Sequence, residues 1–280
     1  MVDLHTHSTA SDGSYSPSEL MAFAASLGIS VIALTDHDTV DGLPGALKAA
    51  ADNSIQCVPG VELSINCPTG EFHLLGLGIN PSGEGLSALL SVLAADRLNR
   101  NSLMIEKMQA AGFTVSLGDI EAIAGSRNIG RPHFAEWLVR NGTVRNRQKA
   151  FDKYLGQGRP IHVRRTGADL DEAINAIKAS GGIPVLAHPL SLYISWGRLE
   201  KVIPELHERG IVGIEAWHPA VKENQCRRLE FMARQSGMFV TAGSDFHGKA
   251  RDDRKLGRTA GGIKIADRFW TEELQPILYE

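Results

Sequence analysis

The sequence contains little that would place the protein outside a cell or in a membrane. Only three of its 280 residues are cysteines, and no pair of them forms a CxxC motif. Such sparse cysteines exclude a disulfide-rich secreted scaffold and favour a reducing compartment. No apolar run approaches the roughly 20 residues that a membrane-spanning helix needs. Residues 1–5 pass directly into polar sequence, unlike a secretory signal peptide, so we expect a cytoplasmic protein with no membrane partner.

The chain also lacks a strong net charge, but its charges are unevenly distributed. The formal net charge is −3. Residues 90–165 contain 13 lysines and arginines against 6 acidic residues, whereas the remainder contains 16 against 26. The middle segment is therefore basic and the rest acidic, which excludes a surface built to bind long duplex nucleic acid.

The content of hydrophobic residues, 43%, excludes a disordered chain and is enough for a sizeable core. Both ends of the chain alternate short apolar strands with helices, without a GxGxxG dinucleotide motif. Repeated βα units of this kind favour a parallel, barrel-like α/β fold. We expect strands over residues 2–5, 29–35, 55–65, 71–79, 183–188, 212–217 and 238–244, and helices over residues 16–27, 44–52, 170–179, 198–209 and 223–236.

A central segment interrupts this rhythm. Four helical patterns follow one another, with no convincing strand between them, over residues 86–111, 119–124, 132–141 and 147–155. We therefore predict a barrel domain formed by residues 1–88 and 166–280, with residues 89–165 as a basic helical insertion that caps the functional face of the barrel.

Residue types that bind metals recur at the ends of the expected strands. They are His5, His7, Asp12, His37, Glu62, His73, His188, Asp245 and His247. The carboxyl ends of parallel strands converge on one face, and the two i, i+2 pairs point their side chains the same way. Histidine combined with carboxylates suits Mn, Fe or Zn. Nine residues exceed what one ion can use, so we predict two to three divalent ions, with Glu62 as a candidate bridge.

Each of these signals has a simpler explanation when taken alone. A single histidine at a strand end is commonly structural, and residues 36–39 are also compatible with a capped turn. The recurrence of ligand types at successive strand ends is what favours a metal centre. Histidines elsewhere fit the simpler explanation: we expect His207 to be a solvated helix residue and His162 to lie in a strand or linker.

Five motifs in chain order resemble those of the PHP (polymerase and histidinol phosphatase) family. They lie at residues 3–13, 34–38, 60–62, 187–189 and 243–247. The resemblance implies a distorted seven-stranded parallel (β/α)7 barrel with an amidohydrolase-like shape. It also implies up to three ions, Mn in the first place and otherwise Fe or Zn. The implied ligand sets are His5, His7, Glu62 and Asp245 for one ion, Asp12, His37 and His247 for a second, and Glu62, His73 and His188 for a third.

Residues 130–135 are similar to the subgroup that contains 3′,5′-nucleoside bisphosphate phosphatases and short-oligoribonucleotide exonucleases. This resemblance implies an enzyme that hydrolyses the 3′-phosphate of a small nucleotide such as adenosine 3′,5′-bisphosphate. Short oligoribonucleotides, degraded 5′→3′, are a second implied substrate. Histidinol-phosphate phosphatase, or another PHP phosphoesterase, is an alternative. A non-catalytic, metal-stabilised module is an alternative of another class, against which the complete ligand set argues.

The insertion contains the candidate substrate-binding residues. Arg131 and Pro132 predict a helix start, where the backbone N–H groups of His133 and Phe134 are free to bind phosphate. Arg131 would add bidentate hydrogen bonds. Three residues of the long helix, namely Asn99, Arg100 and Asn101, are further candidates for lining the same cleft, with a solvated helix face as the alternative.

The candidate catalytic residues lie at the strand ends. Asp12, His37 and His247 are expected to hold the ion next to the scissile phosphate and the leaving oxygen. His218 follows a strand end and has no assigned metal. We predict that it protonates the leaving group, and the alternative is that it only packs at the rim.

Overall fold

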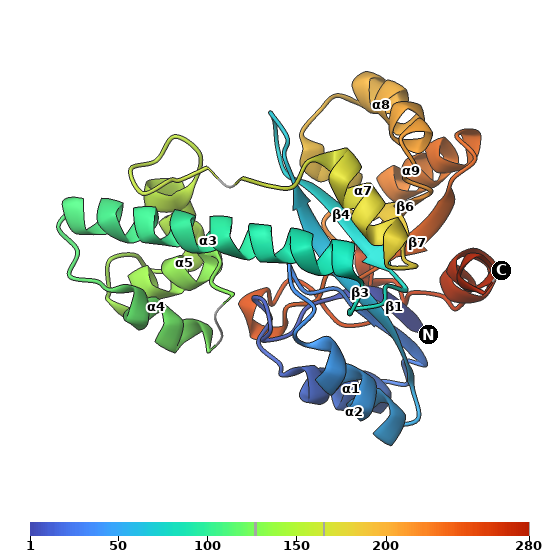
Figure 1. Ribbon diagram of the computed structural model, residues 1–280, viewed down its shortest axis with the longest axis horizontal. Coiled ribbons are helices and arrows are strands. Elements are labelled where there is room, and N and C mark those ends of the chain that lie inside the picture. The colour runs from blue at the N-terminus through green and yellow to red at the C-terminus, as the bar shows by residue number, and fades with distance from the viewer. Residues whose placement is uncertain (126–127, 165, 280) are drawn as a thin grey trace.

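The computed structural model describes residues 1–125, 128–164 and 166–279, and its centre is a seven-stranded sheet curled into a nearly closed barrel (Figure 1). The strands follow one another around the sheet in chain order: β1 (Val2–Thr6), β2 (Val31–Leu34), β3 (Gln56–Ile65), β4 (Phe72–Leu77), β5 (Ile183–Leu186), β6 (Gly213–Trp217) and β7 (Phe239–Ala242). Just beyond the ends of β1 and β7, the His7 N–H donates a 2.9 Å hydrogen bond to the Phe246 carbonyl. The predicted α/β fold with a distorted seven-stranded barrel is confirmed.

One strand departs from the parallel arrangement expected from the sequence. β4 runs antiparallel to both β3 and β5, whereas the other neighbouring pairs are parallel. The connection between β3 and β4 is a turn of a few residues, and a parallel connection needs about a dozen or more. The chain therefore forms a hairpin here. The reversal places the start of β4 beside the carboxyl ends of the parallel strands.

A buried carboxylate on β1 closes the barrel. Asp3 has no exposed surface and accepts hydrogen bonds from the backbone N–H of Ser244 at 2.9 Å and of Gly257 at 2.8 Å. The Ser244 hydroxyl donates a third at 2.5 Å. Burial raises the pKa of Asp3 to about 6, although these hydrogen bonds oppose the shift. Asp3 thereby ties β1 to the segment after β7, which carries the last two predicted metal ligands.

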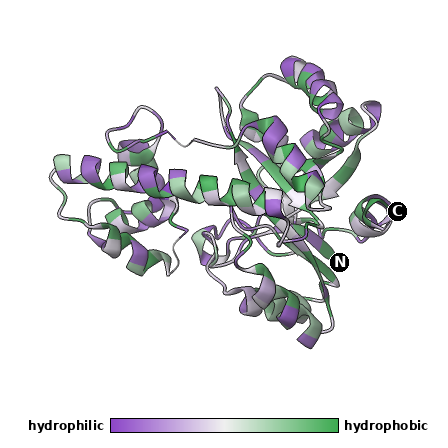
Figure 2. Ribbon diagram, viewed as in Figure 1, coloured by the Kyte–Doolittle hydropathy of each residue, from purple (hydrophilic) through white to green (hydrophobic). Residues whose placement is uncertain are grey.

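Helices cover the outside of the barrel, while the strands are almost wholly buried (Figures 1 and 2). The helices are α1 (Pro17–Ser26), α2 (Leu43–Asp52), α7 (Leu170–Ala179), α8 (Trp196–Glu208) and α9 (Glu223–Gln235), with short segments η2 (Pro189–Leu192), η3 (Gly248–Ala250), η4 (Ala260–Gly262), η5 (Phe269–Leu274) and α10 (Gln275–Leu278). Ser16 caps α1 by accepting from the Glu19 N–H, and Glu19 accepts from the Ser16 N–H in return. The helical segment at the end of the chain, η5 with α10, is absent from the sequence prediction. Among the described residues, no helix is both long and apolar enough to cross a membrane.

The long helix α3 (Glu84–Ala110) joins the barrel to a second group of helices. Its 27 residues span about 40 Å at 1.5 Å per residue. Figure 1 shows it extending from the barrel to the remaining helices, which are α4 (Leu117–Ala124), α5 (Arg131–Arg140), α6 (Arg147–Ala150) and η1 (Phe151–Leu155). At its start, Leu86 packs in the barrel core, whereas Met104 and Met108 belong to a separate core formed with the insertion. The helix thus takes part in two hydrophobic cores.

The division into residues 1–88, 89–165 and 166–280 remains a prediction, and Arg165 at its boundary lies outside the described residues. Two cores joined by one helix are compatible with such a division. His162 lies in an irregular segment between the insertion and the barrel, and His207 lies in α8 and is partly buried.

Phe134 is completely buried in the core of the insertion. We expect Phe134→Ala to lower the free energy of unfolding by about 3–5 kcal/mol, because it leaves a cavity in a packed core. Denaturant titration monitored by circular dichroism measures this change. Phe231→Ala is the control, since Phe231 is 63% exposed on α9 and should change stability by less than about 0.5 kcal/mol. Equal stability of the two variants would contradict the structural role of Phe134.

Candidate metal centre

The nine predicted ligands converge at one end of the barrel. All but Glu62, which lies within β3, come from a strand end or from the loop after it: His5, His7, Asp12, His37, Glu62, His73, His188, Asp245 and His247. His73 is the second residue of β4, and it lies at this end because β4 is antiparallel. Four overlapping groups have potential ligand atoms within 4.8 Å of one another: His7, Asp12, His37 and His247; His5, His7 and Asp245; His5, Glu62 and His188; and His37, Glu62 and His73.

Glu62 is the centre of this arrangement, and its side chain has no exposed surface. Oε1 lies 2.8 Å from His73 Nδ1 and 2.9 Å from His188 Nε2, while Oε2 lies 2.8 Å from His37 Nδ1, 3.3 Å from His7 Nε2 and 3.4 Å from His5 Nε2. The two oxygens thus face different sets of histidines. This geometry is compatible with the predicted bridge between two ions.

Outer contacts orient three of the histidines. Nδ1 of His5 lies 2.9 Å from a Glu215 oxygen, and Nδ1 of His247 lies 2.8 Å from the Asp245 carbonyl. Nδ1 of His188 lies 2.9 Å from the Ser191 hydroxyl, which itself donates to a backbone carbonyl. Each of these oxygens can accept a proton held on Nδ1. The Nε2 lone pair then faces the cluster, as histidine ligands of metals require.

Several buried polar atoms in the cluster have no hydrogen-bond partner among the residues that the structure describes. They include His7 Nδ1, Asp12 Oδ1, His37 Nδ1 and Glu62 Oε2. Asp12 Oδ1 lies 3.2 Å from His247 Nε2, and Glu62 Oε2 lies 2.8 Å from His37 Nδ1, without hydrogen-bonding geometry. Ligand atoms about 2.1 Å from a common ion lie roughly 3 Å apart, so such spacing fits a shared cation. The residues therefore fit divalent metal ions.

The pKa shifts in the cluster also indicate that added positive charge is favourable there. Burial by itself would lower the pKa of His5, but Glu215 and Glu62 outweigh it and raise that pKa to about 10. Burial would raise the pKa of Glu62, yet His37, His73 and His5 hold it well below its usual range. Glu62 is thus ionised at a position with no exposed surface, where an added cation is stabilised.

Two ligands have a backbone conformation that side chains rarely adopt. His188 has φ +25° and Asp245 has φ +47°. Such strained positions persist only where the surrounding structure fixes them, and they cluster at functional sites. Next to Asp245, a Cβ on Gly243 would lie 2.2 Å from the Cβ of His5 and 2.5 Å from an oxygen of Glu215. Only glycine allows β7 to approach β1 this closely.

Three further residues support the cluster, and the sequence prediction gave none of them a role. Glu215, 1% exposed, bonds His5 through one oxygen and accepts from the His188 N–H at 2.9 Å through the other. Asp36 accepts from the hydroxyls of Ser8 and Ser11, which fixes the loop that carries Asp12. The position of Glu215 at a strand end could have indicated its role.

Arg254 is the third, and no sequence signal distinguishes it from the other charged residues around it. It is 6% exposed and forms an ion pair with Asp245. Its Nη1 also lies 3.1 Å from His218 Nε2. Burial lowers the pKa of Arg254 to about 10, against the nearby carboxylates, so the guanidinium stays charged at neutral pH.

His218 lies inside the cluster rather than at its rim. Its side chain is 3% exposed, and Nε2 lies 3.3 Å from Asp245 Oδ2. The Ala220 N–H donates to its Nδ1 at 3.2 Å. Both ring nitrogens are therefore occupied by protein contacts, which fits the orientation of Asp245. Its role as leaving-group acid remains a prediction.

The start of α5 lies beside the metal centre. Arg131 forms a 2.8 Å ion pair with Glu71, the residue before β4. Burial lowers the pKa of His133, and Asp12 is near enough to oppose that shift. His133 Nδ1 accepts from the Gly130 N–H at 2.9 Å, so this side chain caps the helix together with Pro132 at its first turn. The Phe134 side chain is buried in the core of the insertion, and phosphate binding by its backbone N–H remains a prediction. The His133 N–H is not free as expected, because it donates to the Gly130 carbonyl at 3.1 Å.

The candidates on α3 differ in position. Asn101 is fully buried and Arg100 is 5% exposed, and both donate to the carbonyl of Ile129. These two residues therefore hold the segment before α5, and their side chains are not on an open face. Asn99 is exposed. Binding of substrate by any of the three remains a prediction.

The insertion is attached directly to the loop after β2. Asn128 donates to the carbonyl of His37 at 2.7 Å. Arg97 of α3 contacts Asp38 at 2.5 Å, and both residues are buried. Contacts on two consecutive residues of the metal-binding loop fix the insertion relative to the centre.

Comparisons with known proteins agree with this geometry. The family model described as PHP domain matches residues 3–138. The chain is 34% identical to a 3′,5′-nucleoside bisphosphate phosphatase of Chromobacterium violaceum, over 97% of this chain and 95% of that protein. It is 36% identical to a 5′-3′ exoribonuclease of Haemophilus influenzae, over 88% and 89% of the two chains.

A solved structure gives the same result at the level of the fold. The proposed metal-dependent phosphoesterase of Bifidobacterium adolescentis superposes with a TM-score of 0.85 at 30% identity, covering 98% of this chain and 95% of that one. Three observations lead to the same family assignment: the barrel, the convergent ligands and the relatives that match almost from end to end. The chain belongs to the PHP family of metal-dependent phosphoesterases.

Proposed function

We propose that the protein is a phosphatase that removes the 3′-phosphate from 3′,5′-nucleoside bisphosphates, such as adenosine 3′,5′-bisphosphate, and leaves the 5′-monophosphate. The observation that carries the proposal is a complete set of nine convergent ligands beside the basic start of α5. Relatives with this activity and with exoribonuclease activity support it, and short oligoribonucleotides are therefore a second substrate. Its three free cysteines are consistent with a cytoplasmic location.

The metal ligands are assigned as the sequence predicts: His5, His7, Glu62 and Asp245 for one ion, Asp12, His37 and His247 for the second, and Glu62, His73 and His188 for the third. Nitrogen and carboxylate ligands suit Mn, our preferred metal, as well as Fe and Zn. When bound, such ions neutralise phosphate charge and lower the pKa of water.

The reaction is hydrolysis of a phosphate monoester. The oxygen of a water molecule forms a new bond to phosphorus, the bond from phosphorus to O3′ breaks, and O3′ takes up a proton. Asp12, His37 and His247 lie on the side of the cluster that faces α5, and we assign them to the site of the scissile phosphate. Asp245, oriented by His218 and Arg254, lies next to this group, with Oδ1 3.1 Å from His7 Nε2.

The second phosphate of the substrate is assigned to Arg131 and His133. In the structure, the Arg131 guanidinium forms an ion pair with the Glu71 carboxylate at 2.8 Å. A phosphate dianion presents more acceptor oxygens than a carboxylate and can replace it through bidentate hydrogen bonds. Histidinol phosphate has no second phosphate to use this contact, so a bisphosphate is favoured over it. The complete set of nine convergent ligands argues against a non-catalytic module.

The first prediction concerns metal-dependent turnover. Glu62→Gln should lower phosphate release from adenosine 3′,5′-bisphosphate by more than about 100-fold, beyond the 10–100-fold usual for residues that only support a ligand. It should also lower the metal content measured by mass spectrometry. Glu205→Gln, on the exposed face of α8, is the control. A chelator should abolish release by the wild type.

The same assay identifies the substrate. The 2′,5′ isomer, 5′-AMP, histidinol phosphate and a short RNA are the comparison substrates in Mn-containing buffer, and for the RNA the released mononucleotide is measured instead of phosphate. Selective loss of the 3′-phosphate is the expected result. Phosphate release from histidinol phosphate alone would support the metal centre but overturn the proposed substrate. No product from any of these compounds would favour a non-catalytic module.

The second prediction concerns Arg131. Arg131→Ala should raise KM for the bisphosphate about tenfold or more and leave KM for a monophosphate nearly unchanged, because only the bisphosphate loses a charge-assisted hydrogen bond. Steady-state kinetics on both substrates measure the difference. Arg140→Ala removes an exposed arginine from the other end of α5 and should change neither KM. Equal effects of Arg131→Ala on both substrates would contradict the assignment.

The third prediction separates two roles of His218. If it orients Asp245, His218→Ala should lower kcat about tenfold at every pH, because its effect does not involve a proton transfer. If it is the leaving-group acid, the wild-type kcat falls at high pH and that decline disappears in the variant. The geometry favours the first result, and the pH profile of kcat for both proteins decides.

A further inference from the structure

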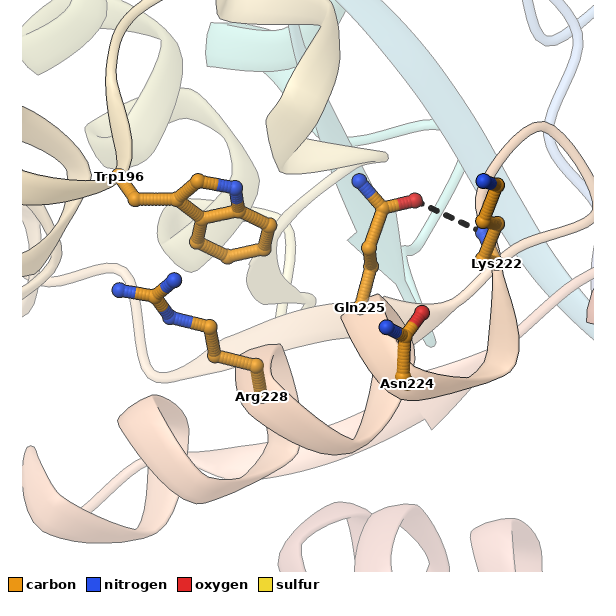
Figure 3. A pocket seen from close by; sticks show the side chains of 5 residues that line it. All are labelled: Trp196, Lys222, Asn224, Gln225 and Arg228. Carbon is orange, nitrogen blue, oxygen red and sulfur yellow. Dashed lines mark hydrogen bonds between the residues drawn. The ribbon is translucent and has the colours of Figure 1, made fainter.

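A pocket outside the metal centre lies between the starts of α8 and α9. Its volume is about 300 Å³, at the lower end for sites of small ligands. Trp196 contributes one wall, and the opposite side is formed by Lys222, Asn224, Gln225 and Arg228 (Figure 3). None of these residues takes part in the metal centre.

The side chains of this pocket are arranged in advance. The Arg228 guanidinium lies 4.4 Å from the centroid of the Trp196 ring, and Glu200 holds the same guanidinium at 2.8 Å. Gln225 Oε1 accepts from the Lys222 N–H at 2.9 Å, which leaves its amide NH2 as a donor. Lys222 is exposed and forms no ion pair with any described residue. The pocket therefore offers an aromatic surface, amide groups and a cation.

The pocket lies on the same face as the metal centre. Both helices follow strands whose carboxyl ends carry residues of the centre, namely His188 after β5 and His218 after β6. Lys222 is only four residues after His218, so their Cα atoms are at most roughly 14 Å apart. A stacked strand advances about 3.4 Å per nucleotide, so about four nucleotides cover that distance.

An aromatic ring with neighbouring amides and a cation is typical of sites for single-stranded nucleic acid. Bases of any sequence stack on a tryptophan, and cations contact the phosphates between them. The acidic neighbours of the pocket are mostly neutralised, because Glu200 pairs with Arg228 and Glu223 pairs with Arg227. We therefore expect base stacking to contribute more than net charge to the binding of nucleic acid in this pocket.

We propose that this pocket is an outer subsite for an oligoribonucleotide. A base downstream of the nucleotide in the metal centre stacks against the Trp196–Arg228 pair, in which the guanidinium lies over one face of the ring, and Lys222 contacts the adjoining phosphate. The proposal rests on the second substrate of the proposed function. It predicts that the subsite acts on chains of several nucleotides and does not contribute to the binding of a mononucleotide.

The test compares two substrates, a 5′-phosphorylated pentaribonucleotide and adenosine 3′,5′-bisphosphate. Trp196→Ala should raise KM for the pentamer about tenfold and leave KM for the bisphosphate unchanged, in line with the loss of one stacked base. Trp196→Phe keeps an aromatic face and should restore most of the affinity. The effect should be smaller for a dinucleotide than for the pentamer.

A matched control lies on α9. Phe231→Ala removes an exposed aromatic side chain outside the pocket. It should not change KM for the pentamer, whereas Arg228→Ala should raise it. An equal effect of Trp196→Ala on both substrates, or no effect on either, would overturn the proposal.

Binding of a fluorescein-labelled pentamer, measured by anisotropy with chelator present, keeps this test independent of turnover. Weaker binding by Trp196→Ala than by the wild type supports the subsite even if neither protein degrades RNA. Unchanged or absent binding overturns it. Loss of phosphate release from the bisphosphate together with loss of mononucleotide release from the pentamer would contradict the proposed function instead, and the anisotropy result would still decide on the pocket.

Discussion

The buried carboxylate of Glu62 is the constraint on which the functional end of the barrel depends. An ionised carboxylate without solvent is strongly unfavourable unless it is paired. Five histidines surround Glu62, but neutral imidazoles carry no charge, and without another cation a histidine such as His5 must hold a proton. Divalent ions supply that charge and leave the imidazoles free as ligands. Metal binding and the stability of this end are therefore coupled.

This coupling extends to residues that do not face the ions. A histidine binds a metal only through a nitrogen without a proton, and the partner of the other nitrogen decides which one that is. Glu215 holds His5, Ser191 holds His188, and the carbonyl of Asp245 holds His247. Glu215 also fixes the backbone of His188, so one carboxylate positions ligands from two different strands.

The sequence predicts the barrel and the convergence of the ligands because both depend on patterns that are local along the chain. Residue type at strand ends is enough to select His5 or Glu62. The short connection between β3 and β4 explains why β4 is antiparallel. The sequence of β4 itself does not show its direction, because an apolar run is compatible with a parallel or an antiparallel strand. Contacts such as Glu215 with His5 depend on side chains 210 residues apart, and no local pattern contains them. The burial of Arg100 and Asn101 could not be predicted either. The helix α3 packs against the barrel at its start and against the insertion further along, so its buried face does not follow one local pattern.

The positive net charge of the insertion suggests long-range attraction of a polyanion, but several of its arginines are paired with carboxylates. In the described part of the chain, Arg97 pairs with Asp38, Arg131 with Glu71, and both Arg140 and Arg147 with Glu136. Positive charge that is already paired exerts little long-range attraction on a polyanion. In the proposed function, recognition at the metal centre depends instead on local exchange, in which a phosphate would displace Glu71 from Arg131. Such an exchange favours a small ligand with a phosphate at a fixed distance from the scissile one over a long polymer attracted by charge alone.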